Sequence, residues 1–312
     1  MDREQWLSER TYRGADFDPV RLAAAAAAQV FRISVCLPAL NVADTVGPII
    51  EAVRARLMRE VPLVDEIIVV DSCSTDATRR RAAEAGARVV EEGAVLPHLP
   101  PGSGKGEALW KSLAAADGDL VVWLDSDVSP PVPEFVPGLL GPLLAEPAVG
   151  YVKAVYRRTF EGSGDGGGRV TEICARPLIN LFYPELAGFA QPLSGEAAGR
   201  RDLLRSVPFL SGYAVEMGLL IDLMRRHGLG ALAQVDVGER SHSHQSTAAL
   251  GEMASAITQA VMSRLADEGR APRELGSQAE YAQPARVDGR WTLTTTITRP
   301  TERPPMDTVA GA

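Results

Sequence analysis

Short apolar runs alternate with amphipathic segments along the first 125 residues. We predict that the apolar runs are buried strands, because they are short and rich in β-branched residues; they cover residues 33–37, 66–71, 87–90 and 120–124. The segments between them carry helical spacing or helix-capping residues and are predicted to be helices at 46–57, 79–85 and 106–116. This order predicts an α/β fold with a parallel sheet between two layers of helices, and a Rossmann-like nucleotide-binding unit in the first half.

The second half continues the pattern less regularly. Strands are predicted at 150–157, 231–237 and 290–297, and helices at 170–181, 213–226 and 248–265. We expect Ser194-Gly195-Glu196 to open another helical stretch, and the tail from Pro300 onward to be loose. The predicted organisation is a helical N-terminal lead (1–31), a Rossmann-like half (32–128), a second half (129–268) and a C-terminal extension with an edge strand (269–312).

The composition excludes several classes of protein. The 312 residues are 46% apolar, enough for a large core. The net charge of −8 argues against nucleic acid or an anionic membrane as the main partner. Three widely spaced cysteines suggest neither a disulfide framework nor a cysteine-based zinc site. With a charged N-terminus and no apolar run long enough for a membrane span, a cytoplasmic location is expected.

Two acids end the apolar run at 120–124. Asp125 and Asp127 would lie at the carboxyl end of a central strand, where ligands collect in open α/β sheets. Two carboxylates there can converge on Mg²⁺ or Mn²⁺, which also bind substrate phosphates. A solvated turn is the alternative interpretation of such a pair.

Lys105 stands in a glycine-rich segment directly before a predicted helix. The segment is not a Walker A motif, since Gly106 follows the lysine where Ser or Thr is needed. The dinucleotide fingerprint is also missing from the first strand-to-helix turn, at residues 38–41. A lysine at a helix N-terminus suits a diphosphate, although a mobile surface lysine is the alternative.

The second half holds further candidates. A glycine-rich loop at 162–168 precedes Arg169 and Thr171 at a predicted helix start, which suits a phosphate or carboxylate; a disordered loop with an incidental arginine is the alternative. Glu216 lies in an apolar helix, either on its polar face or directed into a site. His242 and His244 would share one side of an extended chain, as a metal pair or as part of a polar loop.

Seven motifs, taken together, resemble the retaining GT-A-fold glycosyltransferases that make glucosyl-3-phosphoglycerate or mannosyl-3-phosphoglycerate in actinobacteria. The resemblance runs from about residue 33 to about residue 265. The motifs that carry it are Leu-Pro-Ala-Leu-Asn (37–41), Asp-Ser-Cys-Ser-Thr-Asp (71–76), Gly-Lys-Gly-Glu-Ala-Leu-Trp (104–110), Asp-Ser-Asp (125–127), Gly-Gly-Gly-Arg-Val-Thr-Glu (166–172), Gln-Pro-Leu-Ser-Gly-Glu (191–196) and Gly-Tyr-Ala-Val-Glu (212–216).

The resemblance implies a role for each matching residue. Asp127 and His242 would bind the metal, and Lys105, Asp125 and Glu216 would act at the reacting centre. The acceptor, 3-phosphoglycerate, would be held by Gly168, Arg169, Thr171 and His244. The nucleotide sugar would be held by Pro38, Ala39, Leu40, Asn41, Asp71, Ser72, Lys105, Asp125, Ser126 and Arg240.

Two residues depart from the family pattern. Val42 replaces an acid, which affects one nucleotide contact, and His244 replaces an asparagine, which affects one acceptor contact. The resemblance implies a homodimer that transfers glucose from UDP-glucose to the 2-hydroxyl of 3-phosphoglycerate. The alternatives are mannose transfer from GDP-mannose, or a nucleotide-sugar-binding module without turnover. A nucleotidyltransferase or epimerase is disfavoured because no pyrophosphate-binding glycine loop or Tyr-Lys dyad is found on the first turns.

Overall fold

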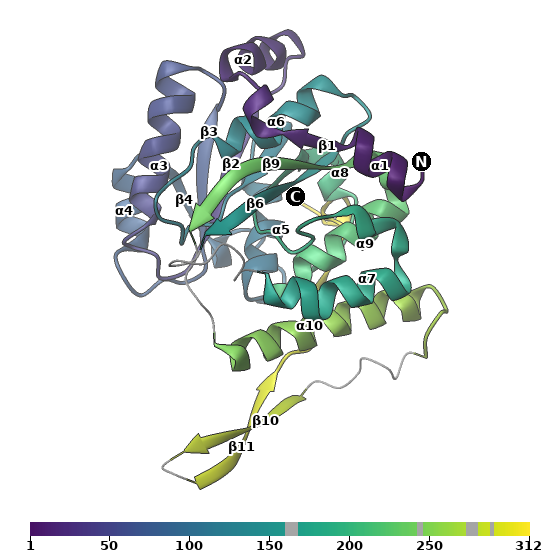
Figure 1. Ribbon diagram of the computed structural model, residues 1–312. Helices are drawn as coiled ribbons and strands as arrows, with labels where there is room; N and C mark the ends of the chain where they lie inside the picture. Colours follow the sequence, from purple (N-terminus) through teal and green to yellow (C-terminus); the bar gives the residue numbers. More distant parts are fainter. Residues whose placement is uncertain (160–167, 242–245, 273–279, 288–289) are drawn as a thin grey trace.

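The computed structural model describes residues 1–159, 168–241, 246–272, 280–287 and 290–312. An eight-stranded sheet forms its centre, in the order β1-β9-β6-β7-β5-β2-β3-β4 (Figure 1). Neighbouring strands are parallel except at β7, which is antiparallel to both β5 and β6. The predicted mainly parallel α/β fold is confirmed. The strands of this sheet are β1 (Thr11–Arg13), β2 (Ile33–Ala39), β3 (Glu66–Asp71), β4 (Arg88–Glu91), β5 (Leu120–Trp123), β6 (Tyr151–Thr159), β7 (Ala197–Arg200) and β9 (Leu232–Ser241).

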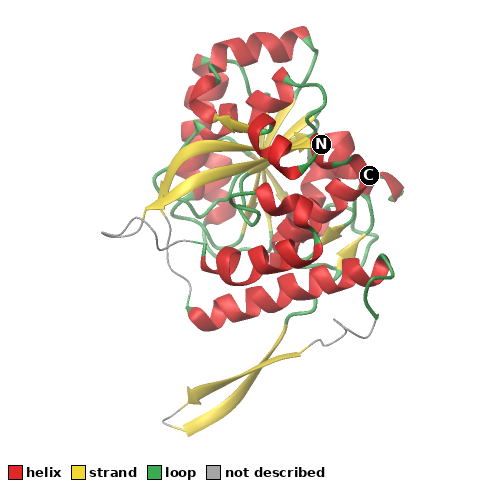
Figure 2. Ribbon diagram, turned by 45° about the vertical axis from the view of Figure 1, so that its right-hand side comes forward, coloured by secondary structure: helices red, strands yellow, loops and turns green. Residues whose placement is uncertain are grey.

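Helices cover both faces of the sheet (Figure 2). Strand residues alternate between the two faces: Val35 and Leu37 join one buried cluster with helices α2, α3 and α6, while Cys36 joins a second cluster with α5 and α9. This alternation follows from the two-residue period of a strand. The α-helices are α1 (Arg3–Glu9), α2 (Pro19–Ala28), α3 (Val46–Arg54), α4 (Thr78–Glu84), α5 (Lys105–Ala115), α6 (Phe135–Ala145), α7 (Arg176–Phe182), α8 (Arg201–Arg205), α9 (Val215–His227) and α10 (Thr247–Asp267).

The N-terminal lead is part of this sheet. It contains the expected alanine-rich helix, α2, and also strand β1, which pairs with β9 at the edge of the sheet. Trp6 of α1 is fully buried, and its indole N–H donates to the Leu232 carbonyl at 2.7 Å. The lead therefore supports the strand that carries Arg240.

The helical stretch expected from Ser194 onward is wrong. Residues 197–200 form β7, inserted between β5 and β6, and only the five-residue α8 follows it. The segment Ala-Ala-Gly-Arg has no apolar period, so its neighbours decide its structure: it is covered on both faces and paired on both edges.

The C-terminal extension also differs from expectation. The predicted strand at 290–297 is present as β11 (Arg290–Ile297), but it pairs with β10 (Glu280–Val287) in a separate hairpin that projects beyond α10 (Figures 1 and 2). The expectation of a loose tail is wrong, since β12 (Glu302–Arg303) pairs with β8 (Phe209–Leu210) and Met306 is fully buried. Among the described residues, no helix combines the length and apolar character that crossing a membrane requires.

Candidate active site

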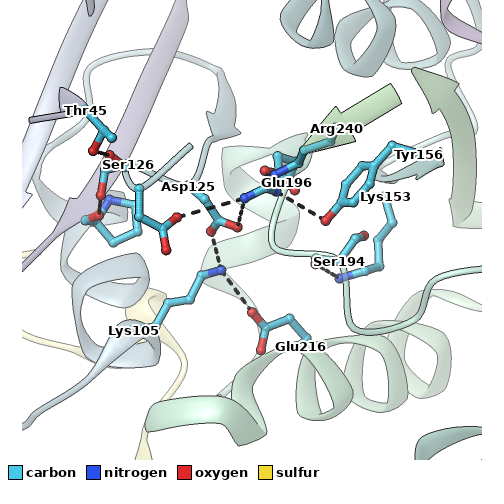
Figure 3. Close-up of polar contacts among 12 residues, drawn as sticks. Thr45, Lys105, Asp125, Ser126, Lys153, Tyr156, Ser194, Glu196, Glu216 and Arg240 are labelled. Carbon is cyan, nitrogen blue, oxygen red and sulfur yellow. Dashed lines mark hydrogen bonds and ion pairs between the residues drawn. The ribbon is translucent and has the colours of Figure 1, made fainter. Parts of the chain in front are cut away.

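The candidate site lies at the carboxyl ends of the central strands. Asp125 and Asp127 follow β5, and Arg240 lies near the end of β9. Lys105 is the first residue of α5, and Glu216 lies in the first turn of α9. Ligands of open α/β sheets bind at this edge. The fold thus brings charged residues from four separate parts of the chain together (Figure 3).

The Lys105 ammonium group joins two carboxylates. Its Nζ lies 2.6 Å from Asp125 Oδ1 and 3.2 Å from Glu216 Oε1. Gly195 packs directly against this contact, and a Cβ at that position would lie 2.4 Å from Nζ and 2.5 Å from Asp125 Oδ1. The close approach of lysine and aspartate therefore depends on a glycine at 195.

Arg240 forms the other side of the cluster (Figure 3). Its Nη2 lies 3.1 Å from Asp125 Oδ2 and 3.9 Å from Asp127 Oδ1. Its Nη1 pairs with the buried Glu196 and donates to the Tyr156 hydroxyl at 3.2 Å, with the guanidinium 5.2 Å from the centre of the Tyr156 ring. These contacts fix the planar guanidinium in one orientation.

The charges in this cluster stabilise one another. Burial opposes the charged form of Lys105, but the carboxylates of Asp125 and Glu216 outweigh it and raise the pKa of Lys105 above its ordinary value. Burial likewise opposes ionisation of Asp125, but Lys105 and Arg240 lower the pKa of that carboxyl well below its usual range. Lys105 and Asp125 therefore stay ionised at neutral pH and present fixed charges, the arrangement that stabilises charge developing on a substrate.

Three residues of this region were missed in the sequence. Glu196 and Tyr156 hold Arg240, and Lys153 is 1% exposed with its Nζ donating to the Ser194 carbonyl at 2.8 Å. Burial lowers the pKa of Lys153 to about 8. A lysine inside the apolar run of β6 was the available signal, because such a residue is rarely buried without a polar partner.

The predicted nucleotide residues at 38–41 form the end of β2 and the turn after it. Ser126 Oγ donates to the Pro38 carbonyl at 2.5 Å, which ties this turn to the end of β5. Ala39 is buried, whereas Leu40 is 56% exposed. Asn41 has a positive φ of 53°, a conformation that asparagine tolerates better than most residues. Their role in binding a nucleotide stays a prediction.

Asp71 and Ser72 lie at the end of the neighbouring strand β3. Asp71 is 1% exposed; its Oδ2 accepts the Ser74 N–H at 3.1 Å, while its Oδ1 has no hydrogen-bond partner among the described residues. Ser72 Oγ donates to Glu92 Oε2 at 2.5 Å. A buried acceptor without a partner is costly, so Asp71 fits a ligand that brings a donor N–H, such as a nucleobase.

The predicted acceptor residues begin a different helical segment. Gly168 has a positive φ of 82°, Arg169 is partly buried, and Thr171 is buried at the start of a π-helical turn (Thr171–Ala175) that continues into α7. Their assignment to 3-phosphoglycerate stays a prediction. His242 and His244 lie outside the described residues.

Of the two predicted metal ligands, Asp127 and His242, Asp127 lies among the described residues. Its side chain is 69% exposed, with a distant contact to Arg240 at 3.9 Å, and such an accessible carboxylate suits Mg²⁺ or Mn²⁺, which prefer oxygen ligands. Asp125 is less available, because both of its oxygens contact cations. Within the described ranges, no group of three or more His, Cys, Asp or Glu side chains forms a metal site. Substrate phosphates, water and His242 would have to complete the coordination.

Comparison with known proteins assigns the chain to a family. The sequence family described as Glycosyl transferase family 2 matches residues 34–206. The glucosyl-3-phosphoglycerate synthase of Mycolicibacterium smegmatis is 47% identical over 271 residues, covering 85% of this chain and 88% of that protein. The crystal structure of mannosyl-3-phosphoglycerate synthase from Rubrobacter xylanophilus superposes with a TM-score of 0.91 at 43% identity, covering 98% and 97% of the two chains. The chain belongs to the glucosyl- and mannosyl-3-phosphoglycerate synthase family.

A third relative comes with bound ligands. The glucosyl-3-phosphoglycerate synthase of Mycobacterium tuberculosis, in complex with Mn²⁺, UDP and phosphoglyceric acid, superposes with a TM-score of 0.83 at 44% identity, covering 93% of this chain and 95% of that one. The predicted synthase family, its GT-A fold and its classification as a hexosyltransferase are thus confirmed.

Proposed function

We propose that this synthase-family chain transfers glucose from UDP-glucose to the 2-hydroxyl of 3-phospho-D-glycerate, giving glucosyl-3-phosphoglycerate. The observation that carries the proposal is the buried cluster of Lys105, Asp125, Glu216 and Arg240 at the carboxyl edge of the sheet. It places fixed positive groups beside carboxylates in a fold whose M. tuberculosis relative has been solved with Mn²⁺, UDP-glucose and phosphoglyceric acid.

The donor occupies the ends of β2, β3 and β5 in this proposal. The base meets Asp71 Oδ1, which has no hydrogen-bond partner in the described part of the chain, with Ser72 and the turn at 38–41 around it. The diphosphate lies toward Lys105 and Arg240. Lys105 and Asp125 already form an ion pair, so the sugar phosphate enters a site whose charges are in place and need little reorganisation.

Asp127 and His242 hold the divalent cation in this proposal. Structures of the M. tuberculosis enzyme contain Mn²⁺ or Mg²⁺ together with UDP. Such a cation neutralises negative charge on the leaving diphosphate. The exposed carboxylate of Asp127 is suited to that position, because it remains accessible while Asp125 is held by Lys105 and Arg240.

The acceptor enters from the side of Gly168, Arg169 and Thr171, with His244 as a further contact. In the transfer step, the bond between the sugar C1 and the phosphate oxygen breaks, and its electron pair stays on the phosphate. The acceptor oxygen bonds to C1, and its proton passes to the leaving phosphate. This front-face route retains configuration without a covalent enzyme intermediate, and Glu216, held by Lys105, positions the sugar. A glycosyl-enzyme trapped on Glu216 would contradict it.

A direct assay tests the function. We expect the purified protein with UDP-glucose, 3-phosphoglycerate and Mn²⁺ or Mg²⁺ to release UDP and form glucosyl-3-phosphoglycerate, followed by mass spectrometry. Asp127→Ala should lose divalent-dependent activity, whereas Asp44→Ala is a matched control because that side chain is 97% exposed. UDP release that does not depend on 3-phosphoglycerate would reject the proposal, and binding without turnover would indicate a nucleotide-sugar-binding module.

Mannose transfer from GDP-mannose is the second candidate. The R. xylanophilus mannosyl-3-phosphoglycerate synthase, at a TM-score of 0.91, supports it. One hydroxyl orientation separates glucose from mannose, and one or two side chains can read it. The same assay with GDP-mannose decides between the two donors by the ratio of their kcat/KM values.

We further propose a homodimer in the cytoplasm, as the sequence resemblance and composition suggested. We also propose that residues 32–128 form the nucleotide-sugar-binding half and residues 129–268 the acceptor-binding half, from which Glu216 and Arg240 reach the donor. Sedimentation velocity tests the assembly, with a species of twice the chain mass as the expected result. A monomer at micromolar concentration would contradict it.

A further inference from the structure

The C-terminal residues Glu302–Met306 lie against the elements that carry the site. β12 pairs antiparallel with β8, with Arg303 opposite Phe209, and β8 precedes the helix of Glu216. The Trp110 indole of α5 donates to the Pro304 carbonyl at 2.9 Å. The last part of the chain thus contacts both the segment before α9 and the helix that begins with Lys105.

Arg303 makes the most extensive of these contacts. Its Nε lies 2.6 Å from Glu107 Oε2 and its Nη2 2.8 Å from Glu107 Oε1, so the two side chains form a two-pronged ion pair. Nη2 also donates to the Pro100 carbonyl at 2.6 Å. The guanidinium lies 5.3 Å from the centre of the Trp110 ring. Arg303 therefore connects the loop at Pro100 to the first turn of α5.

The loop between these two contacts leads directly into Lys105. Its sequence is Pro-Gly-Ser-Gly at 101–104, so few of its own side chains can make contacts that hold the backbone in place. A Cβ at Gly102 would lie 2.3 Å from the Glu107 carboxylate and 2.7 Å from Arg303 Nη2, and Gly104 has a positive φ of 81°. The backbone is thus packed onto the Arg303–Glu107 pair, and glycine allows that approach.

The same ion pair connects to the end of β3. Glu107 is 2% exposed, and its Oε1 lies 3.3 Å from Lys111 Nζ. Lys111 donates to the Glu92 carbonyl at 2.7 Å, and Glu92 accepts the Ser72 hydroxyl at 2.5 Å. Buried charges held this way restrict one another's positions. Arg303 therefore stands at one end of a network that reaches a second predicted nucleotide contact, Ser72.

We propose that Arg303 is a positioning residue of the donor site. By holding Pro100 and Glu107, it fixes the glycine-rich segment 101–104 and the first turn of α5, and so the place of Lys105. This rests on the proposed function, because Lys105 is assigned there to the sugar nucleotide's diphosphate. Arg303 acts through Lys105 and touches no substrate.

Kinetics of three variants test the role. Arg303→Ala should raise the KM for UDP-glucose on the order of tenfold, because a small displacement of a binding group has a large effect, and should leave the KM for 3-phosphoglycerate within about twofold. Arg303→Lys should fall between, since lysine keeps the charge but cannot contact both Glu107 oxygens and Pro100. Arg299→Ala is the control, an exposed arginine four residues earlier on the same segment.

Hydrogen exchange gives a readout that does not depend on turnover. In Arg303→Ala, amides of residues 102–107 should exchange faster, while those of β5 and β2 exchange as in the wild type. If the wild type transfers no glucose, the proposed function fails, and this measurement still decides the positioning role. Unchanged exchange at 102–107 would overturn the proposal. So would a variant that is merely less stable and keeps its KM for UDP-glucose, or an equal effect of Arg299→Ala.

Discussion

At Gly195 the lack of a side chain is what lets Lys105 and Asp125 meet. A methyl group there would overlap both the ammonium and the carboxylate. We expect Gly195→Ala to displace Lys105 and lower kcat/KM for the sugar nucleotide on the order of 100-fold, because catalytic groups lose effect when moved by about 1 Å. Initial-rate kinetics with a circular dichroism check of folding measure this.

Gly230→Ala is the matched control for that substitution. A Cβ at Gly230 would meet no atom of the described residues within 4 Å, and the position has no positive φ. Equal activity of the Gly195→Ala variant and the wild type would show that the Lys105–Asp125 contact is unimportant for the reaction.

Lys153 predicts a pH dependence of stability. Its folded-state pKa is lowered to about 8 by burial, from an ordinary 10.5. Between these values the unfolded chain binds more protons, so the free energy of unfolding rises with pH across that window. Below pH 8 the buried charge costs the most. Lys153→Met should therefore be more stable than the wild type at pH 7 by about 1–3 kcal/mol, after the loss of its hydrogen bond to Ser194.

The gain of Lys153→Met should shrink as the pH rises from 8 toward 10.5. Urea unfolding of both proteins at pH 7 and pH 9.5 measures the difference, and other titrating groups cancel because both chains contain them. A difference that is the same at both pH values would mean that burial of the charge is not its cause.

At the scale of elements, the sequence predicted the strands and helices that have a clear period. The apolar runs became β2, β3, β4 and β5, and the helix predicted at 106–116 is present as α5, which begins one residue earlier, at Lys105. Asp125 and Asp127 followed β5 as expected. The carboxyl ends of parallel strands lie at one edge of the sheet, so the position of these two acids could be predicted from the strand alone. Local pattern was sufficient wherever an element has a continuous apolar run or a helical period of its own.

The missed elements depend on residues far away in the chain. β1 and β7 are three and four residues long, and their partners decide that they are strands. The same holds for the site. Arg240 is oriented by Tyr156 of β6 and by Glu196, which directly precedes β7, and sequence spacing does not reveal these contacts. The tail from Pro300 was taken as loose because its anchors, Trp110 and Glu107, lie almost 200 positions away.

Helices α9 and α10 are joined to the tail by a buried charge network. Arg264 is 2% exposed; its Nη2 lies 2.7 Å from Asp222 Oδ2, and its Nη1 pairs with Glu302. Removing one partner leaves the other buried without compensation, so Arg264→Ala should lower the free energy of unfolding by about 3–5 kcal/mol. Urea unfolding measures it.

A double substitution separates the loss of the interaction from the uncompensated charge. Asp222→Leu with Arg264→Met should recover most of the stability, because apolar groups of similar volume often replace a buried ion pair at little cost. A double variant as unstable as Arg264→Ala would mean that the charges themselves are needed to join the two helices.

At the scale of the whole molecule, the proposed donor and acceptor halves share one sheet. β7, from the second half, pairs with β5 of the first, and β6 pairs with β7 and β9. The N-terminal lead adds β1 to β9, and the C-terminal residues add β12 beside β8. The charged cluster therefore depends on segments from every part of the chain, which is why no fragment is expected to contain a working site.

Trp6 provides a test of that unity. Its buried ring lies 4.4 Å from the Phe189 ring centre, and its N–H bonds to Leu232 on β9. Trp6→Ala should lower the free energy of unfolding by about 3–5 kcal/mol, as expected for a large buried aromatic side chain. If the sheet unfolds as one unit, circular dichroism and the fluorescence of the remaining tryptophans should show coincident transitions at the lower denaturant concentration. A partial loss of circular dichroism at lower denaturant concentration, with the tryptophan fluorescence transition unchanged, would instead show that the lead unfolds independently of the strand that carries Arg240.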